Sequence, residues 1–139
     1  MLVYVDGSAL SRYLPGDPGF PEAAAWHEWA DEHRGDLVTT PLSLTELRRA
    51  ADVLGAEARE CARAVELEVP RLRFSDQTLK VAAMASSVLG PFAALHVGTA
   101  VSHPDVEAIA TYDPLVARVA AIYKLVVISP GRPANWWLG

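Results

Sequence analysis

Two aspartates each follow an apolar run of the kind that forms a buried strand in a parallel sheet. Leu2–Val5 precedes Asp6, and the mostly apolar run from Val106 to Tyr112 precedes Asp113. Open α/β sheets bind ligands at the carboxyl ends of their strands. Two carboxylates at one edge repel each other unless a cation neutralises them, so the first hypothesis is a hard divalent metal. The alternative is that each aspartate only caps the helix that follows it.

Glu46 is a third candidate acid. It comes three residues after Ser43, a spacing that predicts a capping box at the start of a helix reaching about Leu54. The same position, just after a short strand, could also direct its carboxylate toward the sheet edge. Arg49 lies three residues further on. It could pair with Glu46 along the helix or contact a phosphate near the metal.

The elements that would position these residues alternate between strand and helix. This order predicts an α/β fold with a parallel sheet of about four to five strands, flanked by helices on both faces and carrying a helical hairpin insertion. Turn residues gather at 17–21. The expected strands are Leu2–Val5, Leu37–Thr40, Leu72–Phe74, Val106–Thr111 and Leu125–Ile128. The expected helices are Ser8–Leu14, Glu22–Arg34, Ser43–Leu54, Ala56–Leu67, Ser75–Leu89, Phe92–Ser102 and Pro114–Ala121.

Length and composition narrow the class of protein. The 139 residues predict a single domain spanning 1–139. The net charge of -5 argues against a nucleic-acid binder that works by bulk electrostatics, so RNA binding would need a local arginine cluster and metal ions. No leader is apparent, and no apolar run approaches the ~20 residues of a membrane span. With Cys61 as the single cysteine, a cytoplasmic protein is expected.

Four short motifs in order give the chain a family resemblance that covers essentially its whole length. They are Val5-Asp6-Gly7-Ser8-Ala9-Leu10, Leu44-Thr45-Glu46-Leu47-Arg48-Arg49-Ala50, Ala94-Leu95-His96-Val97-Gly98-Thr99-Ala100 and Thr111-Tyr112-Asp113. Together with the closing Val127-Ile128-Ser129-Pro130-Gly131, they resemble a PIN-domain ribonuclease of the VapC toxin family. Each motif is weak alone, whereas the ordered set is specific.

The resemblance implies a PIN-like fold and an Mg²⁺- or Mn²⁺-dependent endoribonuclease that is toxic to its own bacterial or archaeal cell. It further implies restraint by a small VapB-like antitoxin, a homodimer, and a structured RNA substrate such as tRNA or rRNA. By position, Asp6, Glu46 and Asp113 would be the acids of the metal site and would carry catalysis. Ser8 would support the first acid, and Arg12 would contact RNA phosphate.

One departure bears directly on activity. The family pattern before the Leu-His step is Asp-Ala-Leu-His, whereas this chain has Ala93-Ala94-Leu95-His96. The missing acid predicts weaker metal binding and an inactive or weakened enzyme. Ala93 is either a natural loss or an engineered replacement. If the alignment is shifted, Asp105 is the nearest substitute acid.

The other aromatic and histidine residues favour structural roles. His96 is expected to be a packed, hydrogen-bonded core histidine. Trp26 and Trp29 are expected to be partly buried, with an exposed share available to an antitoxin helix or a dimer contact.

Two further functions compete with the nuclease. One is a non-catalytic PIN module that binds antitoxin or RNA, which a nuclease assay would separate from the enzyme. The other is a phosphatase using Asp6 as nucleophile. That class is disfavoured because neither Lys80 nor Lys124 stands at the carboxyl end of an expected strand.

Overall fold

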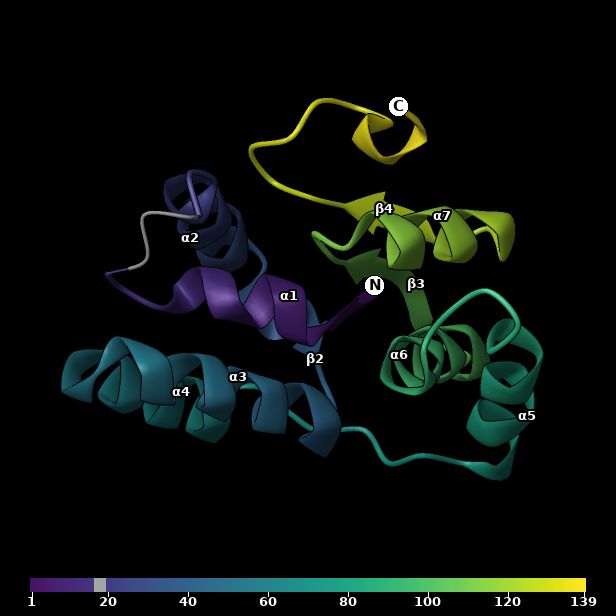
Figure 1. Cartoon of the computed structure of the whole chain (residues 1–139), viewed down its shortest axis with the longest axis horizontal. Helices are drawn as coiled ribbons and strands as arrows, with labels where there is room; N and C mark the ends of the chain where they lie inside the picture. The colour runs from purple at the N-terminus through teal and green to yellow at the C-terminus, as the bar shows by residue number, and fades with distance from the viewer. Residues whose placement is uncertain (17–19) are drawn as a thin grey trace.

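The computed structural model describes residues 1–16 and 20–139, so most of the expected turn at 17–21 lies outside the described residues. Four parallel strands form a sheet in the order β2-β1-β3-β4, as the α/β prediction requires (Figure 1). The strands are β1 (Leu2–Val5), β2 (Leu37–Val38), β3 (Val106–Ala110) and β4 (Val126–Ile128). Because β1 and β3 are adjacent, the residues that follow them meet at one edge of the sheet.

Seven α-helices surround this sheet among the described residues. They are α1 (Gly7–Leu10), α2 (Ala23–Glu32), α3 (Pro41–Leu54), α4 (Ala56–Glu68), α5 (Asp76–Ala85), α6 (Pro91–Ser102) and α7 (Pro114–Ile122). Short 3-10 turns cover Ser11–Tyr13, Arg34–Asp36 and Trp136–Leu138. In this part of the chain, every helix is too short or too polar to cross a membrane. The predicted hairpin is confirmed as α3 and α4, joined at Gly55, whose φ of 111° favours glycine.

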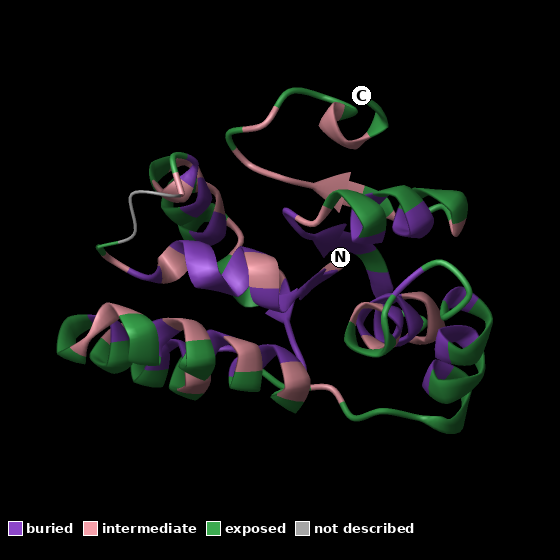
Figure 2. Ribbon diagram, viewed as in Figure 1, coloured by how far each residue is buried: buried purple, intermediate pink, exposed green. Residues whose placement is uncertain are grey.

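The two faces of the sheet bury two separate apolar clusters. Val3 and Val5 of β1 pack with α1 to α4, whereas Tyr4, between them, packs with α5, α6 and α7. Ala108 and Ile109 of β3 alternate in the same way. Successive side chains of each strand thus point to opposite faces of the sheet. Both faces are apolar and are covered by helices, as expected for a buried parallel sheet. Figure 2 shows the result: α1 is largely buried, and the outer faces of α4 and α5 are exposed.

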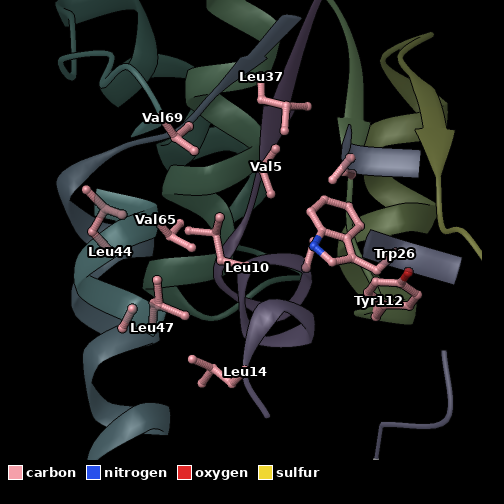
Figure 3. Close-up of a cluster of buried hydrophobic side chains, with 14 of the residues drawn as sticks. Val5, Leu10, Leu14, Trp26, Leu37, Leu44, Leu47, Val65, Val69 and Tyr112 are labelled. Atoms are coloured by element: carbon pink, nitrogen blue, oxygen red, sulfur yellow. The ribbon is translucent and has the colours of Figure 1, made fainter. Parts of the chain in front are cut away.

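Trp26 is the largest fully buried side chain among the described residues and belongs to the first cluster. Figure 3 shows its indole beside Tyr112, and the two ring centroids are 6.4 Å apart. The expectation of a partly buried Trp26 is therefore wrong, because α2 packs this face against the core. Trp29 is partly exposed and stacks on His33. Of the two tryptophans, only Trp29 presents surface to a partner.

The expected strand Leu72–Phe74 does not form. Arg71 makes a single bridge with Thr39, and the Leu72 amide donates to the Thr39 carbonyl at 2.7 Å. Arg73 and Phe74 are exposed, and Ser75 caps α5 directly afterwards. The segment is too short and too exposed to extend the sheet beyond this bridge.

Helix α6 contains the third of the four family motifs, Ala94 to Ala100, and runs antiparallel to β3. Its last residue, Ser102, is joined to β3 through a short loop, so the N-terminus of α6 lies toward the carboxyl edge of the sheet. Gly98 allows close contact with α5, since a Cβ there would lie 2.5 Å from the Thr78 carbonyl oxygen. This contact fixes α6, and with it the position of Ala93 and His96.

Candidate active site

Asp6 is buried at the carboxyl end of β1, with 2% of its surface exposed. Its Oδ1 accepts hydrogen bonds from the Ala9 amide at 3.0 Å and the Ser8 hydroxyl at 2.6 Å. Its Oδ2 accepts from the Thr111 hydroxyl at 2.5 Å. Asp6 is thus the N-cap of α1. Ser8 supports the carboxylate directly.

The charge of Asp6 is only partly compensated by these neighbours. Burial raises the pKa of Asp6 above its ordinary value, while His96 and the donors Ser8, Thr111 and Ala9 lower it by less. The protein therefore holds a carboxylate whose ionised form its own groups do not fully stabilise. A bound cation would supply the missing compensation.

Asp113 is linked to Asp6 through one residue, Thr111. The Thr111 hydroxyl donates to Asp6 and accepts from the Asp113 amide at 3.1 Å. Asp113 also caps α7, because its Oδ1 accepts from the amides of Leu115 and Val116. Both aspartates are thus helix caps, the alternative raised from sequence. Capping uses one carboxylate oxygen of Asp113. The other oxygen makes no hydrogen bond to any residue that the structure describes.

Glu46 lies against the backbone next to Asp6. A Cβ on Gly7 would be 2.7 Å from Glu46 Cδ and 2.9 Å from its Oε1, so the absence of a side chain at Gly7 permits this approach. The Oε1 atom is 2.5 Å from His96 Nε2, and the carboxylate does not pair with Arg49. The expected Ser43–Glu46 capping box is wrong, since Thr40 caps α3 and Pro41 occupies its first turn.

Ala93 and Asp105 lie at different ends of α6. Ala93 is partly buried in the first turn of this helix, three residues before His96 and therefore on the same face. Asp105 is exposed and immediately precedes β3, at the opposite edge of the sheet from Asp6. The structure thus gives no support to Asp105 as the substitute acid.

The two arginines expected near RNA are placed differently. Arg49 is exposed on α3 and forms no ion pair with any residue that the structure describes. Arg12 is buried, and its guanidinium donates to Glu22 Oε1 and to the Ser8 carbonyl. It also lies 4.3 Å from the centre of the Tyr112 ring. This placement gives no support to a phosphate contact by Arg12.

Carboxylate oxygens are the ligands that hard cations prefer, and Mg²⁺ is commonly held by one or two carboxylates with water and phosphate completing its shell. Asp6 and Asp113, with Glu46 beside them, fit that chemistry. Within residues 1–16 and 20–139, however, no three His, Cys, Asp or Glu side chains are arranged so that they could hold a metal ion. The predicted three-acid group is thus not assembled as a closed ligand cage.

Sequence reasoning missed three residues of this site. Thr111 was quoted only within a motif, yet it joins the two aspartates. His96 is buried and hydrogen-bonded as expected, but its contact with Glu46 was not foreseen. Tyr4, in the middle of β1, is hydrogen-bonded to this histidine through its hydroxyl. A hydroxyl two residues before Asp113 was the one signal available from the sequence.

Replacing Asp6 with asparagine is expected to raise the melting temperature at pH 7 in the presence of a chelator. The raised pKa of Asp6 means that its ionisation costs stability as the pH rises above the unfolded value of about 3.9. The difference in melting temperature between Asp6→Asn and the parent should therefore vanish below about pH 4. Thermal unfolding across this range checks it. An Asp6→Asn protein that is less stable than the parent at pH 7 would contradict the inference that the Asp6 charge is uncompensated.

Comparison with known proteins defines the class. The PIN domain family matches residues 3–122, and the chain belongs to this family. PIN domains are generally metal-dependent nucleases, so a nuclease is the activity that family membership supports. No curated protein and no solved structure matches the chain. The phosphatase reading is set aside, because the match covers both Asp6 and Asp113.

Proposed function

We propose that the protein is the toxin of a type II toxin–antitoxin system, a VapC-like endoribonuclease that depends on Mg²⁺ or Mn²⁺. The observation that carries this proposal is the buried Asp6, joined to Asp113 through Thr111 at the carboxyl edge of the sheet. Such a pair of acids has the chemistry to hold a divalent cation against an RNA phosphate. Membership of the PIN domain family supports the nuclease part of the proposal.

In this proposal Asp6 and Asp113 hold the cation, with Glu46 beside them. The cation, when bound, activates water and offsets charge on the phosphate. Ser8 and Thr111 donate to opposite oxygens of Asp6 and fix its orientation. In the same proposal Arg49, which is exposed one turn along α3 from Glu46, contacts a neighbouring phosphate.

The proposed partners follow from the resemblance to VapC toxins. We expect a VapB-like antitoxin, a structured RNA substrate such as tRNA or rRNA, a homodimer and a cytoplasmic location. An acidic site that lacks one of its acids can still accept an antitoxin arginine, because the remaining carboxylates pair with a guanidinium. The exposed side of Trp29 is an apolar surface that an antitoxin helix could cover.

A second candidate is a PIN module that binds antitoxin or RNA without cutting. One observation favours it, which is alanine at position 93, where the family pattern has aspartate. The two candidates differ in one measurable property, which is metal-dependent cleavage.

Incubation of total RNA with excess protein tests the proposal. We expect slow cleavage in Mg²⁺ that stops on chelation and is lost in Asp113→Asn, because the second metal acid is removed. Asp105→Asn is the matched control, since Asp105 is an exposed aspartate at the opposite edge of the sheet. Equal cleavage by Asp113→Asn and the parent would contradict the assigned site.

A further inference from the structure

A buried chain of hydrogen bonds connects the sheet to Glu46. The Tyr4 hydroxyl, in the middle of β1, is 2.7 Å from His96 Nδ1. The other ring nitrogen, Nε2, is 2.5 Å from Glu46 Oε1. Tyr4 is fully buried and His96 is 4% exposed, so two core residues end on a carboxylate that is partly open to solvent.

The Glu46 carboxylate is an acceptor, so Nε2 of His96 carries hydrogen, and Nδ1 faces the Tyr4 hydroxyl. Burial raises the pKa of Tyr4, so its hydroxyl keeps its proton and can donate. Thr40 and Ser43 lie 2.9 Å and 3.1 Å from the Tyr4 oxygen, and both can donate to it. The Tyr4 hydroxyl can then donate to Nδ1 while Nε2–H donates to Glu46.

The contact with His96 restrains the Glu46 side chain, which would otherwise be free to move. The Glu46 side chain is 38% exposed, and a glutamate on an open helix surface samples several rotamers. Here its carboxylate lies between the Gly7 backbone on one side and the His96 ring on the other. His96 cannot follow Glu46 outward, because its ring is buried and bonded to Tyr4.

We propose that His96 is a positioning residue that holds the Glu46 carboxylate at the Asp6 edge of the site, ready for the cation or its bound water. This inference rests on the proposed function. His96 acts through Glu46 and contacts neither metal nor RNA. A partner that orients a ligand carboxylate typically contributes tenfold to a hundredfold to metal affinity or activity.

Two conservative variants separate positioning from packing. His96→Gln keeps an amide donor near the place of Nε2, whereas His96→Asn reaches only the place of Nδ1. Both should lower the melting temperature by similar amounts, because both disturb the same buried site. In the Ala93→Asp background, His96→Asn is expected to weaken Mn²⁺ binding, measured by calorimetry, about tenfold or more. It should also lower kcat with KM little changed. His96→Gln should stay within a few-fold of the parent for both quantities.

Thr99→Val is the matched control, because Thr99 is a buried polar residue of the same helix whose hydroxyl donates only to the Leu95 carbonyl. Equal Mn²⁺ affinity and kcat in His96→Asn, His96→Gln and the parent would overturn the positioning role.

A readout of Glu46 itself distinguishes failure of this inference from failure of the proposed function. If the Ala93→Asp protein neither binds Mn²⁺ nor cuts RNA, the proposed function is wrong. The side-chain carboxyl signal of Glu46 in NMR spectra then decides the positioning role. A signal that is altered in His96→Asn and preserved in His96→Gln supports it. A signal unchanged in both variants overturns it.

Discussion

Ala93→Asp is expected to increase Mg²⁺-dependent RNA cleavage by about a hundredfold, because a well-placed catalytic ligand is worth roughly 3 kcal/mol of activation free energy. Position 93 lies in the first turn of α6, on the same face as His96, whose ring contacts Glu46. A carboxylate there would join Asp6, Glu46 and Asp113. It would also lie at a helix N-terminus, where negative charge is favourable, which offsets part of its repulsion by the neighbouring acids.

Ala93→Asn is the control for this gain of activity, because asparagine has the size of aspartate without its charge. Cleavage of total RNA and of tRNA by the parent and both variants, with and without chelator, provides the measurement. Adding Asp6→Ala to the Ala93→Asp protein should abolish the gained activity. Equal rates for the parent and Ala93→Asp would show that the site does not require a fourth acid.

Glu22→Gln is expected to lower the stability of the protein by about 3 kcal/mol, or roughly 10 °C in melting temperature. Glu22 is 5% exposed and its Oε1 accepts from Arg12 at 2.7 Å and from Arg132 at 3.4 Å. Neutralising it leaves the buried Arg12 guanidinium without its counter-charge. Asp31→Asn, in an exposed pair with Arg34, is the control and should change stability by about 0.5 kcal/mol or less.

The effect of Glu22→Gln should also depend on pH. Burial raises the pKa of Glu22, but hydrogen bonds and charge from Arg12 and Arg132 outweigh it and hold the pKa below its ordinary value. A lowered pKa contributes stability above the unfolded value of about 4.3 that is lost as the pH falls. The difference between the parent and Glu22→Gln should therefore shrink in acid. Thermal unfolding at neutral and acidic pH measures it, and a constant difference would contradict the ion-pair explanation.

The sheet and the helical hairpin were predictable because their signals are local. Apolar runs before Asp6 and Asp113 are the strands β1 and β3, and Gly55 ends α3 where expected. The prediction of a strand at Leu72–Phe74 was wrong, because three residues with an arginine among them do not specify a strand. Periodicity and turn residues fix element type, but they do not fix whether a short segment finds a partner in the sheet.

The places of Asp6 and Asp113 after strands were predictable from sequence, and their connections were not. The cap of α3 was misassigned, because Thr40 and Pro41 start this helix earlier than Ser43 would. The bond between His96 and Glu46 joins residues 50 positions apart. Such a contact depends on where the sheet holds α3 and α6, which no short sequence window contains.

The sheet and its contacts extend beyond the region that the family matches. The family match stops at residue 122, yet β4 forms the sheet edge beyond it at Val126–Ile128. Arg132 then reaches back to Glu22, and Tyr112 donates to the Pro130 carbonyl. A truncation drawn at the family boundary would remove a strand and one arm of a buried ion pair. Expression plasmids for this protein should therefore keep the residues after 122.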